Sequence, residues 1–126
     1  MRLRNDVLAA AYFGVALVLA CSLATGQAQS TGIELFNRRC GGCHALDRDK
    51  EGPRLGDVYG RVAGSVDSFR YSDALKNAKI TWSDKSLDEW LTDPEQVVPN
   101  NDMAFHLENS NERREIIAFL KRYSGK

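Results

Sequence analysis

The segment Cys40-Gly41-Gly42-Cys43-His44 places two thiols and an imidazole within five consecutive residues. The C-x-x-C-H pattern is the attachment signal for c-type haem. Thiols at this spacing lie on one turn of helix, from which both sulfurs can form thioether bonds with the vinyl groups of a porphyrin. The imidazole that follows can then donate a nitrogen to the iron. We therefore predict one covalent haem c with its iron, attached through Cys40 and Cys43, with His44 as the proximal ligand.

Two other uses of this cluster are a zinc knuckle and a redox dithiol. A structural zinc site takes four Cys or His ligands, and only His106 and Cys21 remain to complete such a set. A thioredoxin-like dithiol belongs to an α/β pattern, and no alternating strand pattern of useful length occurs in the chain. The sequence therefore favours the haem interpretation.

A six-coordinate haem needs a second axial ligand. The chain has two methionines, of which Met1 lies in the leader and Met103 lies in a turn-rich loop after Pro99. A thioether on a proline-braced loop suits this role, and His/Met ligation raises the reduction potential. The rival ligand is His106, and the ordinary alternative for Met103 is a core residue that fills a gap. We predict that Met103 is the sixth ligand.

A helical signal precedes the attachment segment. Thr31 and Glu34 have the form of a capping box. Ile33, Phe36 and Cys40 then fall on one face of the helix that this box begins. We expect that face to be buried. We also expect the helix to lead directly into the C-x-x-C-H turn.

Three further helices are expected in an all-α fold of about four to five helices and long loops around one haem. A short helix is predicted over 72–77, a second begins after Ser83 and ends at Pro94, and a third opens at Asn109–Glu112. The apolar residues expected on the buried faces of the last two helices are Leu87, Trp90 and Leu91, and Ile116, Phe119, Leu120 and Tyr123. Residues 45–67 are rich in glycine and charge, which predicts an irregular loop.

The first 28 residues differ in composition from the rest. Arg2 and Arg4 precede an uncharged apolar run, Val7 to Thr25, in the order of a secretory signal peptide. Small residues at Gly26-Gln27-Ala28 place the predicted cleavage after Ala28. An uncleaved membrane anchor is the alternative, because the run is about long enough to span a bilayer. We interpret Cys21 as a bystander within this run rather than a lipidation site.

The predicted domains are thus a signal peptide over 1–28 and one haem-binding domain over 29–126. The whole chain has 17 Lys and Arg against 17 Asp and Glu, which argues against a basic nucleic-acid-binding protein. The mature domain would keep 15 cationic and 16 anionic side chains in 98 residues. Three cysteines are an odd number for a disulfide framework but match two thioethers and one leader cysteine. A domain this small gains stability from a covalently attached group.

From Gly32 to Tyr123 the chain resembles the class I cytochromes c, the small monohaem family of bacteria and mitochondria. The resemblance is specific because several motifs occur in the family's order. They are Gly32 and Phe36 before the C-x-x-C-H segment, Gly52-Pro53-Arg54-Leu55, Gly60-Arg61-Val62-Ala63-Gly64, Phe69-Arg70-Tyr71-Ser72-Asp73-Ala74, Ile80-Thr81-Trp82, Val98-Pro99 with Met103-Ala104-Phe105, and Glu112-Arg113 with Ile116-Ile117-Ala118-Phe119-Leu120-Lys121.

The resemblance implies roles for residues around the haem. The carbonyl of Pro53 would accept a hydrogen bond from the His44 imidazole and fix its tautomer. Phe105 would pack at the haem edge. The residues implied on the propionate side are Arg61, Tyr71, Trp82 and Asn101. The ordinary alternatives are core aromatic residues and a surface charge.

Five positions depart from the family's pattern, among them Asn101, which stands where a threonine is usual. Trp90 stands where a tyrosine is common, which puts the usual hydroxyl contact with the methionine sulfur in question. Asn100 stands where a glycine is usual, and asparagine tolerates the left-handed backbone that this position needs. Asp102 replaces a lysine, and Leu75 stands where an asparagine often helps to hold an internal water.

Charge near the predicted methionine loop also departs from the mitochondrial pattern of lysines around the haem edge. No Lys or Arg occurs from Ser86 through Glu112. The acidic residues of this stretch that lie around the loop are Asp93, Glu95, Asp102 and Glu108. A docking face of this kind is mixed or acidic, so we expect a redox partner that is not strongly acidic. A solvated loop without a partner is the ordinary alternative.

The resemblance implies a periplasmic single-electron carrier rather than an enzyme. Its donor and acceptor would be redox proteins of a respiratory chain, either membrane complexes or periplasmic oxidoreductases, met in transient complexes by a monomer. No nucleic-acid partner is expected. Two alternatives remain: a membrane-anchored haem subunit of a larger oxidoreductase, and a peroxidase-like haem protein with a labile sixth ligand.

Overall fold

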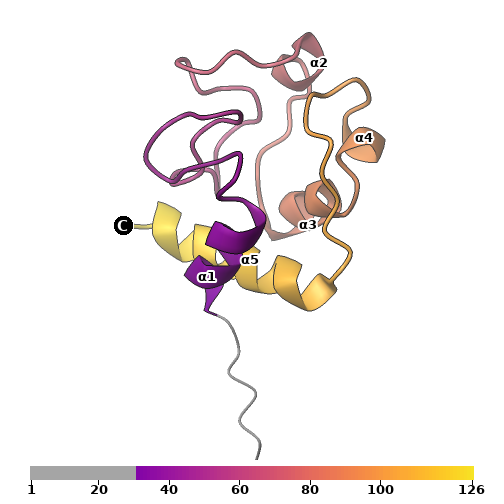
Figure 1. Cartoon of the computed structure of the whole chain (residues 1–126). Coiled ribbons are helices and arrows are strands. Elements are labelled where there is room, and N and C mark those ends of the chain that lie inside the picture. The colour runs from indigo at the N-terminus through magenta and orange to yellow at the C-terminus, as the bar shows by residue number, and fades with distance from the viewer. Residues whose placement is uncertain (1–30) are drawn as a thin grey trace, which may run out of the picture.

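A computed structural model describes residues 31–126, which form five helices joined by long loops (Figure 1). The helices are α1 (Gly32–Arg39), α2 (Asp73–Lys76), α3 (Asp84–Thr92), α4 (Pro94–Val97) and α5 (Ser110–Ser124). Within these residues the β-type pairing is limited to an isolated antiparallel bridge between Val62 and Thr81. The predicted all-α fold is confirmed.

The predicted signal peptide over 1–28, with Met1 and Cys21, lies outside the described residues, so its cleavage stays a prediction. Within residues 31–126, no helix has both the length and the apolar character needed to cross a bilayer.

Helices α1 and α5 pack against each other at the bottom of the view in Figure 1. The contact is close because Gly32 has no side chain: a Cβ at this position would lie 2.5 Å from the Cβ of Phe119. The rings of Phe36 and Phe119 meet beside it, with centroids 5.7 Å apart. At the other end of α1, Arg39 donates two hydrogen bonds to the Glu112 carboxylate, at 2.8 and 3.1 Å. The helix pair is therefore held at both ends of α1.

Helix α3 packs on α5 and begins and ends where the sequence predicts. The Ser83 hydroxyl caps its first turn by accepting from the backbone N–H of Ser86. Its buried residues are Leu87, Trp90 and Leu91. Pro94 both ends α3 and supplies the first residue of α4, which was not predicted as a separate helix. Proline suits this position because the first helical N–H has no intrahelical partner.

Two residues predicted on buried faces are exposed. Ile33 is 40% exposed and Tyr123 is 37% exposed. The face of α1 that meets α5 is centred on Gly32, and successive helical residues are turned by about 100°, so Ile33 points to the side of the contact. Tyr123 lies in the last turn of α5, where its ring packs on Phe119 with centroids 5.9 Å apart. Helix α1 buries Leu35 and Phe36 beside Gly32.

Backbone hydrogen bonds join the two ends of the long central loop. The Gly60 N–H donates to the Trp82 carbonyl at 2.8 Å, and the Trp82 N–H donates to the Arg61 carbonyl at 2.9 Å. A third bond, from the Ala63 N–H to the Ile80 carbonyl at 2.7 Å, closes residues 64–79 into a loop that contains α2. The first two bonds place Arg61 and Trp82 side by side, although 21 residues separate them in the sequence.

Candidate functional site

The C-x-x-C-H segment forms a turn at the end of α1. The N–H groups of Cys43 and His44 both donate to the Cys40 carbonyl, at 3.1 and 2.8 Å. Both cysteines are free, and Cys40 is buried whereas Cys43 is exposed. Burial, and secondarily the neighbouring Cys43, raises the pKa of Cys40 to about 11. One turn thus presents two unpaired thiols and an imidazole together.

The His44 ring is oriented by the backbone of the next loop. Its Nδ1 lies 2.8 Å from the Pro53 carbonyl oxygen. A carbonyl only accepts hydrogen bonds, so Nδ1 carries the proton and Nε2 keeps its lone pair for a metal. Burial is the main cause that lowers the pKa of His44, which favours the neutral, metal-binding imidazole. Gly52 is required here, because a Cβ would collide with the His44 ring.

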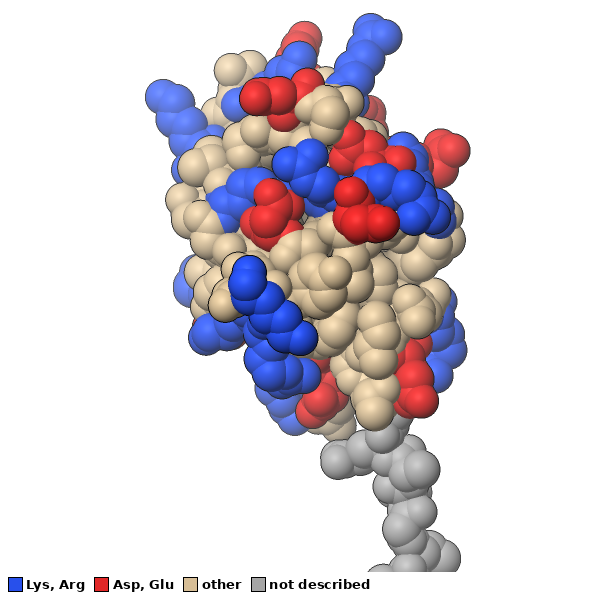
Figure 2. Space-filling view, turned by 90° about the vertical axis from the view of Figure 1, so that its left-hand side faces the viewer, with Lys and Arg blue, Asp and Glu red and all other residues tan. Residues whose placement is uncertain are grey.

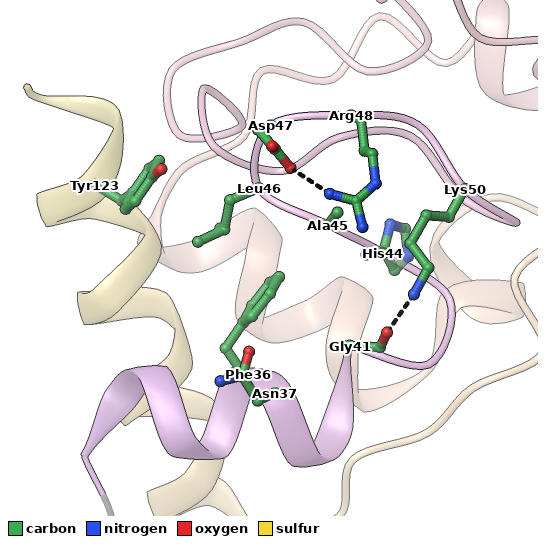
Figure 3. A pocket seen from close by; sticks show the side chains of 10 residues that line it. All are labelled: Phe36, Asn37, Gly41, His44, Ala45, Leu46, Asp47, Arg48, Lys50 and Tyr123. Atoms are coloured by element: carbon green, nitrogen blue, oxygen red, sulfur yellow. Dashed lines mark hydrogen bonds and ion pairs between the residues drawn. The ribbon is translucent and has the colours of Figure 1, made fainter.

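A surface pocket borders the outer side of this turn (Figure 3). Figure 3 shows His44 near one end of the pocket and Leu46 and Tyr123 near the other. Lys50 Nζ donates to the Gly41 carbonyl at the end of the pocket where His44 lies. Together with the bond from the Gly52 N–H to the Cys43 carbonyl, at 2.9 Å, this contact ties the loop after His44 to the attachment turn.

The predicted methionine loop follows α4 and is braced from within. Asn100 has a φ of 65°, which confirms the left-handed backbone predicted for it. The Asn101 side chain accepts from the Met103 N–H at 2.7 Å and donates to Val98 and Glu95 oxygens at 2.9 and 3.3 Å. Because the amide group already donates to Val98 and to Glu95 of α4, a propionate contact of Asn101 stays a prediction. The Met103 side chain packs on the buried core.

The rival ligand His106 lies at the surface, with 56% of its side chain exposed. Its Nδ1 is 3.2 Å from the Thr92 carbonyl oxygen and 4.0 Å from Asp93 Oδ1. A partly buried thioether on the core and an exposed imidazole on the outside favour Met103 over His106 as an axial ligand.

Trp90 contributes a contact that sequence reasoning missed. Its indole Nε1 donates to Met103 Sδ at 3.2 Å. The tyrosine-to-tryptophan departure removes a hydroxyl, but the indole N–H is also a hydrogen-bond donor. That donor chemistry was the signal from which the contact could have been expected.

Residues expected on the propionate side fit a haem carboxylate to different degrees. Arg61 Nη1 pairs with Asp57, and Nη2 donates to the Arg54 carbonyl at 3.0 Å. Arg61 Nε is the one buried side-chain N or O atom without a hydrogen-bond partner in residues 31–126. An arginine N–H forms its strongest hydrogen bonds with carboxylates, so a propionate would satisfy this atom.

The aromatic residues predicted around the haem are all at least partly buried. Trp82, 6% exposed, belongs to the same core cluster as Cys40, and Phe105 is partly buried against that cluster. Tyr71 is 8% exposed, lies outside the cluster and packs edge-on against Phe69, with centroids 4.9 Å apart. The structure thus places Cys40, Trp82, Met103 and Phe105 in or against one buried cluster and leaves Tyr71 outside it.

A zinc knuckle finds no support in the part of the chain that the structure describes. There, no three His, Cys, Asp or Glu side chains lie close enough together to hold a metal ion. Structural zinc needs four such ligands.

Comparison with known proteins decides the family. No protein-family model matches the chain. It is 34% identical over 119 residues to cytochrome c2 of Blastochloris viridis, which covers 90% of this chain and 92% of the relative. It is 42% identical over 99 residues to cytochrome c of Theileria annulata, covering 75% and 85%. The chain belongs to the class I cytochrome c family.

A solved structure agrees with this cytochrome at the level of the fold. Cytochrome cH from Methylobacterium extorquens superposes with a TM-score of 0.68 at 36% identity, covering 72% of this chain and 94% of that one. Class I cytochromes c hold one covalent haem c with its iron and transfer electrons. This cytochrome is accordingly a haem-containing electron carrier and not an enzyme.

Proposed function

We propose that this cytochrome is a periplasmic single-electron carrier, with haem c attached through Cys40 and Cys43 and held by His44 and Met103. The observation that carries the proposal is the bond from His44 to Pro53, which leaves Nε2 of a C-x-x-C-H histidine free for iron. The bracing of Met103 by Asn101 supports a second ligand from the loop after α4.

Each residue of the site has a defined task in this proposal. When bound, the haem supplies a ferric–ferrous couple that accepts and releases one electron. His44 and Met103 would hold the iron and so exclude substrates from it, and thioether ligation would raise the potential. Trp82, which is buried, would lie on the propionate side. Arg61 neutralises propionate charge through Nε, which the protein itself leaves unpaired.

Visible spectra of two ligand variants test the axial ligation. The ferric wild-type protein is expected to show the sulfur-to-iron charge-transfer band. Met103→Ala should lose this band, whereas the matched variant His106→Ala should keep it, because His106 is exposed and outside the core. A band that survives in Met103→Ala, or disappears in His106→Ala, would contradict the assignment.

The mass of the protein in each cell fraction tests whether it is exported and whether its leader is cleaved. Export with cleavage after Ala28 gives a protein of 98 residues that begins at Gln29. Mass spectrometry of the protein isolated from its host should find this form in the periplasmic fraction. An intact leader in the membrane fraction would favour the alternative, an anchored haem subunit of a larger oxidoreductase.

The charge of the methionine-loop side supports a partner that is not strongly acidic. Residues 86–112 contain no Lys or Arg. Four acidic side chains in or beside this loop are exposed or half-buried: Asp93, Glu95, Asp102 and Glu108. The side seen in Figure 2, which carries the loops after α1, has cationic and anionic side chains intermingled instead. Residues 86–112 therefore offer no cationic side chain to an acidic partner.

Salt dependence of electron transfer tests the charge of the partner. Attraction between opposite charges is screened as ionic strength rises, and steered association slows with it. The electron-transfer rate with an acidic redox protein should stay level or rise with added salt. A steep fall in that rate would refute this part of the proposal.

A further inference from the structure

The carboxylate of Glu95 binds two consecutive residues of the methionine loop after α4. Oε1 accepts from the Asn100 backbone N–H at 3.0 Å, and Oε2 accepts from the Asn101 side-chain Nδ2 at 3.3 Å. Residues 86–112 contain no Lys or Arg, and both of these partners are neutral amide groups. A hydrogen bond to an ionised acceptor is stronger than one between neutral groups. Both oxygens of Glu95 thus hold the loop.

Both positions bound by Glu95 depart from the family's pattern. Asn100 stands where a glycine is usual and has a φ of 65°. A residue with a side chain is strained in this left-handed region and keeps it where surrounding contacts hold it. The bond from the Asn100 N–H to Glu95 is such a contact. Asn101 stands where a threonine is usual, and its amide has two N–H groups besides an oxygen.

Asn101 connects Glu95 to the proposed sixth ligand. Its Nδ2 also donates to the Val98 carbonyl at 2.9 Å, and its Oδ1 accepts from the Met103 N–H at 2.7 Å. The Asn101 amide is therefore fixed in one orientation. A continuous chain of hydrogen bonds runs from the Glu95 carboxylate through this amide to the backbone of Met103.

Helix α4, which carries Glu95, is fixed to the rest of the fold. Its first residue, Pro94, is fully buried, and the helix packs on α3. The Asp93 side chain caps it by accepting from the Gln96 N–H at 3.2 Å. The Val98 N–H donates to the Pro94 carbonyl at 2.9 Å. A helix this short has little stability of its own, so these contacts are what give Glu95 a fixed origin.

We propose that Glu95 is a positioning residue that keeps the methionine loop closed, so that small external ligands do not replace Met103. This inference rests on the proposed ligation by Met103. The apparent affinity of an external ligand is proportional to the fraction of protein in the open state that binds it. A hydrogen bond of ordinary net strength corresponds to a factor of roughly 2 to 12 in an equilibrium constant.

Imidazole titration of the ferric holoprotein, followed through loss of the sulfur-to-iron band, measures this open fraction. Glu95→Ala removes both bonds and should bind imidazole about threefold to tenfold more tightly than the wild type. Glu95→Gln keeps one acceptor oxygen and should lie between them. Glu89→Ala is the matched control, because it also removes an exposed carboxylate, but one that pairs with Lys85 on α3 at 2.6 Å. Its imidazole affinity should equal that of the wild type.

A double-mutant cycle tests the connection through Asn101. Asn101→Ala removes the amide between Glu95 and Met103, so Glu95→Ala should change imidazole affinity less in this background than in the wild type. Hydrogen exchange tests the bond to the backbone. In NMR spectra of the ferrous holoprotein, the Asn100 amide should exchange with solvent faster in Glu95→Ala than in the wild type.

Four results would overturn the role of Glu95. They are an imidazole affinity of Glu95→Ala equal to that of the wild type, an equal gain in Glu89→Ala, fold-changes that simply multiply in the double variant, and unchanged exchange of the Asn100 amide. Absence of the sulfur-to-iron band in the ferric wild type would instead overturn ligation by Met103, and this inference with it.

Discussion

Substitution of Gly32 tests the close crossing of α1 and α5. The Cβ added by Gly32→Ala would lie 2.5 Å from the Cβ of Phe119 and 3.2 Å from the Glu115 carbonyl oxygen. Carbon atoms rest about 3.5–4.0 Å apart, so the two helices must separate by about 1 Å. Neither neighbouring atom is the end of a flexible side chain, and the strain cannot be relieved by a rotamer change.

The expected loss in the free energy of unfolding is the cost of overpacking minus the gain in helix propensity. Inserting a methyl group into a packed contact costs about 1–3 kcal/mol. Replacing glycine by alanine returns at most about 1 kcal/mol in a helix interior, and less at Gly32, the first residue of α1. We expect a net loss of about 1–2 kcal/mol, which corresponds to a fall in Tm of about 4–16 °C for a domain of this size.

Guanidinium unfolding of the holoprotein, followed by circular dichroism, measures this loss. Gly125→Ala is the matched control, because a Cβ at Gly125 would make only ordinary contacts, at 3.7 and 4.0 Å. Its free energy of unfolding should stay within about 0.5 kcal/mol of the wild type. If Gly32→Ala is as stable as Gly125→Ala, the inference that α1 and α5 are too close to admit a side chain at position 32 is wrong.

Further substitutions test three other contacts. The hydrogen bond from Arg39 lowers the pKa of Glu112. Its stabilisation is therefore present above about pH 4.3, the unfolded value, and is lost as pH falls through the lower folded pKa. Glu112→Gln should lower stability at pH 7 and flatten the acid limb of a stability–pH curve. Gly52→Ala should displace the His44 ring and reduce the yield of low-spin holoprotein seen in visible spectra. Arg113, 9% exposed, donates to two backbone carbonyls at 2.8 Å, so Arg113→Ala should cost about 2–4 kcal/mol in denaturant unfolding.

Each of these predictions has an outcome that contradicts it. An acid limb of Glu112→Gln as steep as that of the wild type would assign the acid sensitivity to other carboxyls. Normal low-spin spectra and yield in Gly52→Ala would show that the His44 loop can move. Full rescue by Arg113→Lys would mean that charge, and not the two-carbonyl geometry of a guanidinium, stabilises this region.

Local signals made much of the fold predictable. Ser83 and Asn109 cap α3 and α5 as expected, because a cap depends only on a side chain and the next three residues. The Pro94 boundary was predictable for the same reason. The burial of α1 was predicted less well: the apolar pattern selected Ile33, whereas the contact is centred on Gly32, which carries no hydrophobic signal.

The candidate site also has parts that local motifs predict and one contact that they do not. The attachment turn and the His44–Pro53 bond follow from motifs that are short in sequence or fixed by family resemblance. The hydrogen bond from Trp90 to Met103 joins residues 13 apart on different elements. No local pattern determines how α3 faces the loop, so this contact emerged only from the packing of the whole chain.

The helix pair also has a consequence for the order of events during folding. Arg39 and Glu112, which join α1 to α5, are 73 residues apart. Contacts so distant in sequence close slowly and late in folding. Until α5 reaches it, α1 lacks its partner. The turn directly after α1, which carries the two thiols, is therefore expected to be among the last parts of the fold to become fixed.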